Sequence, residues 1–127
     1  MKLKTIVIKR LRDLARDYHA AYLTKRPLNP DDIGSERIKD YLTHPKRKKF
    51  KEIVNALSKE ERTELLALVW LGRGGEGATL KDWESLIRHA RNEDDEGTAE
   101  YLIEKALLAD YIDKGLAKME GKQTSGK

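Results

Sequence analysis

The sequence predicts an all-α protein, a compact bundle of five or six short helices around one central apolar helix. Apolar residues recur at helical spacing along most of the chain, and proline and glycine separate these stretches. No stretch of useful length alternates apolar and polar residues as a strand does. The run at 65–71, Leu-Leu-Ala-Leu-Val-Trp-Leu, is apolar without interruption. A helix that is apolar on every side needs other helices around it, so this run should lie at the centre.

The central helix has a start signal and a stop signal. Ser58 and Glu61 have the spacing of a capping box, in which each side chain bonds the backbone N–H of the other residue. Gly72 stands where a left-handed C-cap residue would end the helix. We therefore predict a helix over about 59–71, roughly 20 Å long.

A first helix is predicted from about Leu3 to Leu23. Its core-facing stripe has apolar residues spaced by threes and fours: Leu3, Val7, Leu11, Leu14, Tyr18 and Ala21. Ile6, Ile8 and Tyr22 flank this stripe and widen it. Because they lie outside the stripe, we expect these three to be exposed and to suit an interface, for example in a homodimer.

The next helices follow between breaking residues. The stretch 35–42 is a weak helix candidate, and 45–57 is a stronger one with apolar residues at helical spacing. Thr79, with Asp82 three residues later, predicts another capping box and a helix with Leu80 on its buried face.

The last predicted helix covers about 99–119. Thr98 is its expected N-cap, and a bend is expected near 105–107, where the apolar stripe shifts phase. Gly115 is expected to weaken the last turns, since glycine is a poor helix former.

Composition places the chain in a broad class. Its 127 residues suit one domain, predicted over 1–120, with a disordered tail over 121–127. The absence of cysteine excludes disulfides and thiolate chemistry. The apolar stretch at the N-terminus is too short for a signal peptide, and no run approaches a membrane span. These observations predict a soluble, cytoplasmic protein.

Charge is divided unevenly along the chain. Residues 1–57 carry 15 Lys/Arg and 7 Asp/Glu, a net of +8, and residues 58–127 carry a net of −4. The basic run comprises the candidate anion- or nucleic-acid-binding residues Lys46, Arg47, Lys48, Lys49 and Lys51. Such a cluster can bind phosphates without reading sequence. The alternative is a solvated surface that faces the acidic residues 93–96.

Two further residues are candidates for chemistry. Arg73 lies in the glycine-rich loop 72–77 and is a candidate anion site, although glycine is also the ordinary residue of a helix end. Asp110 stands among apolar residues and is a candidate pocket acid, for example a general base, or else faces water. The three histidines lack metal-ligand spacing, so we predict no metal site and no cofactor.

Aromatic residues offer a different kind of site. Trp70, Trp83, Tyr101 and Tyr111 are candidates to line a groove for a partner helix, because aromatic side chains concentrate at interfaces. The alternative is that they are core residues, which we favour for Trp70.

Three blocks of residues resemble a family of small bacterial proteins of unknown function. The first, 65–74, ends in Val-Trp-Leu-Gly-Arg-Gly; the second is Trp83; the third comprises 98–102 and 107–116. The resemblance covers about 40–117 well and the first helix loosely. Relatives tend to have a Gly-x-Pro turn where this chain has Glu-Lys-Ala at 104–106, and acidic residues where this chain has its basic run. The resemblance implies no activity.

We therefore predict a non-enzymatic protein-interaction module that binds a partner protein or a second copy. The alternative is weak, sequence-independent nucleic-acid binding through 46–51. A third hypothesis is an enzyme centred on Asp110 and Arg73.

Overall fold

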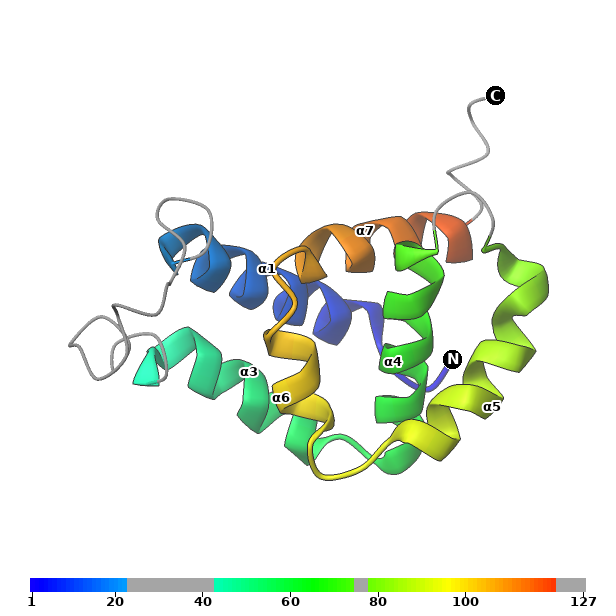
Figure 1. The fold of residues 1–127 in the computed structure, drawn as a ribbon, viewed down its shortest axis with the longest axis horizontal. Coiled ribbons are helices and arrows are strands. Elements are labelled where there is room, and N and C mark those ends of the chain that lie inside the picture. The colour runs from blue at the N-terminus through cyan, green and yellow to red at the C-terminus, as the bar shows by residue number, and fades with distance from the viewer. Residues whose placement is uncertain (23–42, 75–77, 121–127) are drawn as a thin grey trace, which may run out of the picture.

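The computed structural model describes residues 1–22, 43–74 and 78–120, and Figure 1 shows their arrangement. The helices are α1 (Thr5–Tyr22), α3 (Pro45–Ala56), α4 (Lys59–Arg73), a 3₁₀ turn η3 (Leu80–Asp82), α5 (Trp83–Glu93), α6 (Thr98–Ile103) and α7 (Leu108–Met119). These residues contain no strand, which confirms the all-α prediction. The helix predicted over 35–42 and the tail 121–127 lie outside the described residues.

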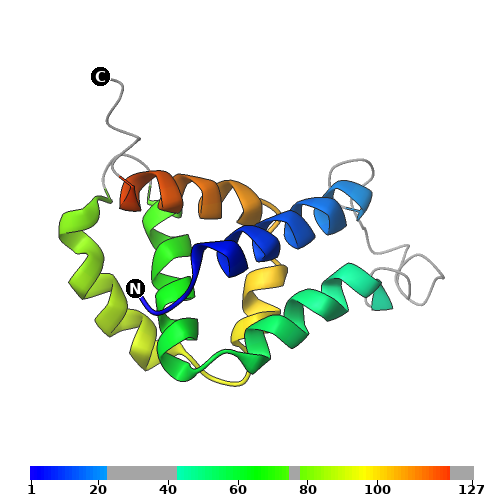
Figure 2. The same ribbon diagram turned by 180° about the vertical axis from the view of Figure 1, so that it is seen from behind.

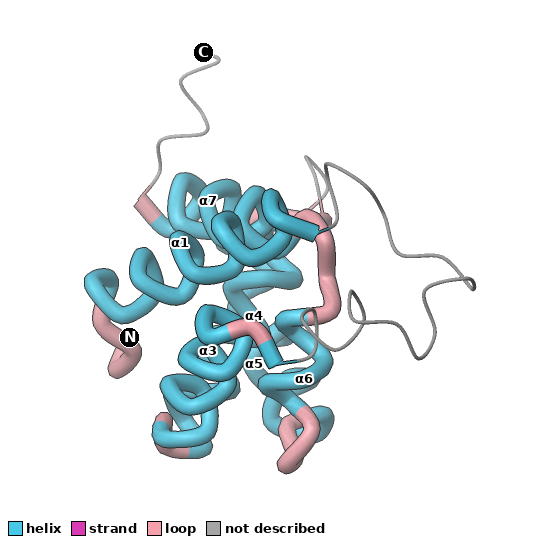
Figure 3. Tube along the Cα trace, turned by 90° about the vertical axis from the view of Figure 1, so that its left-hand side faces the viewer, coloured by secondary structure: helices cyan, strands magenta, loops and turns pink. Residues whose placement is uncertain are grey.

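Helix α4 is the centre of the bundle. It packs most extensively against α7 and α5, and its apolar run is buried except for Trp70, which is half-buried. Seen from behind, α4 stands between α5 and the pair formed by α3 and α6 (Figure 2). Figure 3 shows α1 and α7 together on one side, with α3, α5 and α6 on the other. None of the helices described is long and apolar enough to cross a membrane.

The predicted C-cap at Gly72 is wrong, because α4 continues to Arg73 and Gly74 stands at the C-cap with a φ of −70°. Gly72 lies instead where α4 crosses α7. A Cβ at Gly72 would overlap the Tyr111 carbonyl oxygen and would lie 2.8 Å from the Gly115 nitrogen. A Cβ at Gly115 would in turn overlap the Leu68 carbonyl oxygen. Both glycines therefore allow two backbones to approach closely, and Gly115 is a packing residue rather than a weak point in α7.

The close crossing brings Lys118 of α7 to the end of α4. This buried side chain donates hydrogen bonds to the carbonyl oxygens of Leu71, at 2.8 Å, and Ala78, at 2.6 Å. Burial lowers the pKa of its ammonium group. Lys118, from another helix, thus supplies a hydrogen bond to the Leu71 carbonyl near the end of α4. The sequence had indicated that a glycine would end the helix at this point.

Two capping boxes are confirmed. Ser58 Oγ accepts from the Glu61 N–H at 3.1 Å, while the Ser58 N–H donates to Glu61 Oε1 at 2.8 Å. Thr79 and Asp82 form the second box, at η3. Leu80, expected in the core, is exposed because it belongs to this short turn and precedes α5.

The predicted N-cap at Thr98 is wrong, since Gly97 occupies that position and Thr98 is the first residue of α6. The Thr98 hydroxyl instead donates to Asp94 at 2.8 Å. The bend expected near 105–107 is a full break, because α6 ends at Ile103 and α7 begins at Leu108.

The core-facing stripe of α1 is broader than the sequence indicates. Leu3, Leu11 and Tyr18 are buried as expected, but Ile8 is fully buried as well. The prediction that Ile8 is exposed is wrong because α1 packs against two helices, α3 and α7, and each covers part of its surface.

Candidate functional site

The basic run does not form a single exposed surface. Arg47 lies on the inner face of α3, with Phe50 and Val54, and its side chain is 4% exposed. Its guanidinium pairs with Glu100 and, at 3.2 Å, with Glu104. The solvated position expected for Arg47 is therefore wrong: its charge lies within the contact between α3 and α6.

The neighbouring lysines are more exposed, and several face carboxylates. Lys46 pairs with Asp17 at 2.7 Å and Lys51 with Glu100 at 2.6 Å. Lys49 lies 4.0 Å from Glu52, and Lys48 is exposed. The opposing carboxylates come from α1, α3 and α6, not from residues 93–96 as the alternative reading supposed.

The position of Arg47 leads to a test of its role. We expect Arg47→Met to destabilise the protein by about 1–3 kcal/mol, because it removes a buried charge, takes the cation away from Glu104 and leaves Glu100 paired with Lys51 alone. The matched control, Lys48→Met on the exposed side of α3, should change stability by less than about 0.5 kcal/mol. Urea unfolding followed by circular dichroism measures both values. Equal values for the two variants would contradict a structural role for Arg47.

The acidic residues after α5 are organised by Asp94. Its side chain is 1% exposed and accepts hydrogen bonds from Arg62 Nε at 3.0 Å and from the Thr98 hydroxyl. Lys59 lies 3.4 Å away. Burial acts to raise the pKa of this carboxyl, but the hydrogen bonds from Arg62 and Thr98, together with nearby positive charge, lower it overall. This cluster ties α4 to the start of α6 and holds the intervening loop.

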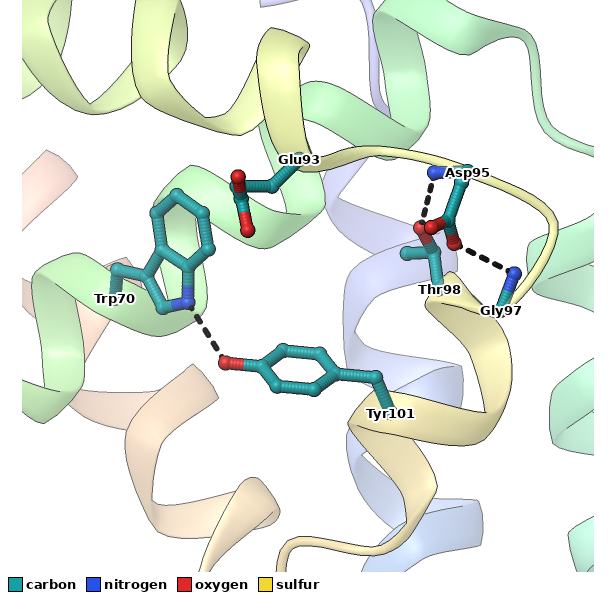
Figure 4. Close-up of a pocket in the computed structure, with 6 residues that line it drawn as sticks. All are labelled: Trp70, Glu93, Asp95, Gly97, Thr98 and Tyr101. Carbon is teal, nitrogen blue, oxygen red and sulfur yellow. Dashed lines mark hydrogen bonds between the residues drawn. The ribbon is translucent and has the colours of Figure 1, made fainter.

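A cleft opens beside this loop, between α4, the end of α5 and α6 (Figure 4). We call it the aromatic–acidic cleft. Its volume is about 360 Å³, and its lining residues are Trp70, Glu93, Asp95, Gly97, Thr98 and Tyr101. In this view Trp70 lies on the left and the ring of Tyr101 lies below the centre. The carboxylates of Glu93 and Asp95 lie above Tyr101, across the hollow from its ring.

The two aromatic side chains are held in place by their neighbours. Trp70 Nε1 donates to the Tyr101 hydroxyl at 3.3 Å, and the Trp70 ring lies 5.2 Å from that of His89. Lys105 Nζ is 4.2 Å from the centre of the Tyr101 ring. Burial raises the pKa of Tyr101, but the Trp70 N–H, Lys105 and Arg73 lower it overall.

The acidic residues show how the loop contributes to the cleft. Asp95 Oδ1 accepts from the Gly97 N–H at 2.7 Å, which fixes this carboxylate against the turn. The side chain of Glu93 is exposed and makes no ion pair or hydrogen bond with any other residue that the structure describes. The sequence made Trp70 and Tyr101 candidate groove residues, with a core position favoured for Trp70, and it did not select Glu93, Asp95 or Thr98. The acidic run just before the Tyr101 helix was the available signal.

Asp110 and Arg73 lie elsewhere. Asp110 is exposed and borders a cavity of about 170 Å³, together with Arg16, His19 and Leu107. His19 is buried, and its Nε2 lies 2.7 Å from the Ile103 carbonyl oxygen. Burial lowers the pKa of His19. Arg73 is exposed at the end of α4, and part of its glycine-rich loop, 75–77, lies outside the described residues. Neither Asp110 nor Arg73 lines the aromatic–acidic cleft.

One of the three predicted interface residues, Ile6, lies on the exposed surface of α1. Ile6 is 76% exposed and borders a groove of about 640 Å³ whose described lining comes from α1 alone. Nothing is described for the side chain of Tyr22.

A second copy on this surface stays a prediction, and Ile6→Glu tests it. We expect any dimer seen by sedimentation velocity to weaken at least tenfold, since the substitution places a charge in an apolar contact. The control is Lys4→Glu, an exposed charge change outside the groove lining. A wild-type chain that stays monomeric at about 100 μM would contradict the homodimer.

Comparison with known protein families gives a match over most of the described helices. Residues 47–120, from the start of α3 to the end of α7, match the model of a family described as protein of unknown function, DUF3775. The chain belongs to the DUF3775 family. This confirms the expected membership of a family of unknown function. No curated protein and no solved structure matches the chain.

The matched region contains one of the candidate sites but not the other. All six residues that line the aromatic–acidic cleft lie within the DUF3775 region, whereas Ile6 and the rest of α1 precede it. Among the residues described for this DUF3775 protein, no group of three or more histidine or acidic side chains is placed to hold a metal ion.

Proposed function

We propose that this DUF3775 protein is a non-enzymatic protein-interaction module, and that its aromatic–acidic cleft receives a segment of a partner protein. The observation that carries the proposal is the composition of the cleft, where two aromatic rings and two carboxylates border one hollow. Tyrosine and tryptophan are over-represented among the residues that dominate protein interfaces. Tyr101 is 42% exposed, which is a large accessible apolar surface for one side chain. The predicted bacterial source and cytoplasmic location belong to the same proposal.

Support also comes from the rigidity of the cleft walls. Trp70 extends from the central helix, whose neighbouring residues are buried. The opposite wall is held by Asp94, which bonds both α4 and α6. A wall that is ordered before binding loses little conformational entropy when a partner arrives, so it contributes to affinity.

The alternative, nucleic-acid binding through 46–51, receives less support. Arg47 is buried, and Lys46 and Lys51 each face a carboxylate. These carboxylates would compete with phosphates and would repel them.

Nucleic-acid binding through 46–51 can be tested by fluorescence anisotropy. We expect labelled single- and double-stranded oligonucleotides to show no binding tighter than about 100 μM at physiological salt, because few of the five cations are available. The control variant carries Lys46→Glu, Lys48→Glu and Lys49→Glu. Micromolar binding that weakens steeply with salt, and that is lost in this variant, would favour the nucleic-acid function instead.

The proposed function is tested by selection from a library of random peptides displayed on phage, with the full chain as bait. Selected peptides should bind the wild-type chain and Leu107→Ala but should bind Tyr101→Ala at least about fivefold more weakly, as expected for loss of an aromatic contact. Leu107 is a suitable control because it is also large and exposed but does not line the cleft. Thermal unfolding verifies that both variants are folded. The proposal fails if no peptide is enriched or if the enriched peptides bind Tyr101→Ala as well as the wild type.

A further inference from the structure

We propose that the chemical group recognised in the aromatic–acidic cleft is a cation, the guanidinium or ammonium group of an arginine or lysine side chain in the partner. This inference rests on the proposed function and adds the chemistry of the ligand.

The carboxylates of the cleft retain negative charge that the described residues do not neutralise. Glu93 has no partner among these residues, and only Oδ1 of Asp95 is used, by the Gly97 N–H. Asp94, which stands between them in sequence, is buried against Arg62 and does not line the cleft. Of the three carboxylates at 93–95, Asp94 is thus paired with a cation, whereas Glu93 and Asp95, which border the hollow, have no described ion pair.

The aromatic rings favour the same ligand. The only N–H of the Trp70 side chain is bonded to Tyr101, so the indole has no donor left for an anionic ligand. Ring faces carry partial negative charge and attract cations. The chain itself provides an example at this ring, since the ammonium group of Lys105 lies 4.2 Å from the centre of Tyr101.

The positive groups nearby determine where a cation would enter. Lys105 and Arg73 lower the pKa of Tyr101 but do not line the cleft, and among the described lining residues the charged ones are Glu93 and Asp95. The hollow is therefore more negative on the side of the loop after α5, and a cationic side chain should approach from that side. A volume of about 360 Å³ is near the small end of ligand sites, which run from about 300 to 1,000 Å³, and suits one long side chain.

The test uses small probes and the full chain. N-acetyl-arginine amide and N-acetyl-lysine amide are titrated into ¹⁵N-labelled protein, with N-acetyl-citrulline amide as the neutral analogue of arginine. We expect the two cations, and not citrulline, to shift the Trp70 indole N–H and the amides of Gly97, Thr98 and Tyr101. Binding should weaken as salt is raised, because exposed charges are screened.

A matched pair of variants locates the charge. Glu93→Gln should weaken binding of the arginine probe about twofold to fivefold, the range expected for one exposed ion pair. Glu96→Gln removes an exposed carboxylate of the same loop that does not line the cleft, and it should leave binding unchanged. Both variants preserve side-chain shape, and unchanged amide spectra elsewhere in the protein would verify the fold.

The outcomes separate the inference from the proposed function. Binding of citrulline as tightly as arginine, no difference between the two variants, or no shift at the cleft would overturn the cation site. If the phage selection yields peptides that depend on Tyr101 but are not enriched in arginine and lysine, the cation inference fails and the interaction function stands. If the arginine probe shifts the cleft but no peptide depends on Tyr101, the cation site stands and the proposed function fails.

Discussion

Replacement of Gly72 by alanine should destabilise the protein by about 3 kcal/mol or more, the range of severe overpacking in a core. The added methyl group would overlap the Tyr111 carbonyl oxygen and crowd the Gly115 nitrogen. These are backbone atoms of α7, so no side-chain rotation relieves the overlap and the two helices must move apart. Because α4 and α7 form the most extensive helix contact described, the cost should extend to the whole core.

Chemical unfolding of Gly72→Ala, monitored by circular dichroism, measures this effect. The control is Gly97→Ala, where the new Cβ would lie 3.2 Å from Asp95 Oδ1, the end of a side chain that can adjust. We expect the control to lose about 1 kcal/mol or less, as for the loss of a favoured N-cap residue. A Gly72→Ala protein as stable as this control would show that α4 and α7 do not approach as closely as described here.

Replacement of Asp94 by asparagine should cost about 2–4 kcal/mol at neutral pH. The substitution keeps the shape of the side chain but removes the charge that faces Arg62, and the Arg62 side chain is itself only 22% exposed. The loop that carries Glu93 and Asp95 should lose its anchor at the same time. We therefore expect weaker binding of any ligand in the aromatic–acidic cleft, although Asp94 does not line it.

The pH dependence of stability separates the contribution of the Asp94 charge from the contribution of its side-chain packing. The folded protein lowers the pKa of Asp94 below the ordinary value of 3.8 for this side chain, so the unfolded chain binds the proton more readily. The stabilisation by this carboxylate is therefore present above about pH 4 and is lost as the pH falls through the folded-state pKa. Urea unfolding from about pH 7 to about pH 3 should show a smaller decline for Asp94→Asn than for the wild type. The control, Glu96→Gln, should follow the wild type.

Local features of the chain predicted much of the secondary structure. The capping pairs Ser58–Glu61 and Thr79–Asp82 place two side chains within one helical turn, so their geometry depends on few other residues. The proline at 45 marks the start of α3 for the same reason. Two cap predictions failed for different reasons: at Gly72 the deciding contact is with the distant helix α7, whereas at Thr98 it is with near neighbours. Thr98 has a good cap side chain, but Asp94 accepts its hydrogen bond and Gly97 occupies the cap position.

The candidate site shows the same division between near and distant contacts. Residue type alone makes Trp70 and Tyr101 candidate groove residues and favours the core for Trp70, but the hydrogen bond between them joins positions 31 residues apart. The acidic loop was visible in the sequence, yet it was matched with the basic run rather than with Arg62. Opposite charges attract at any sequence separation, so composition does not determine which carboxylate meets which cation.

The sequence by itself determined the helical class, the central position of residues 65–71 and the two capping boxes, because periodicity and capping boxes act over a few residues. Only the tertiary structure decided the roles of Gly72, Arg47 and Asp94. Gly72 became a crossing point because α7 packs across it, and Arg47 and Asp94 became buried partners of distant charges. It also decided that Glu93 and Asp95 share a hollow with Trp70 and Tyr101. The physical reason is that burial and charge pairing depend on which helices meet, and that choice is made by the packing of the whole chain.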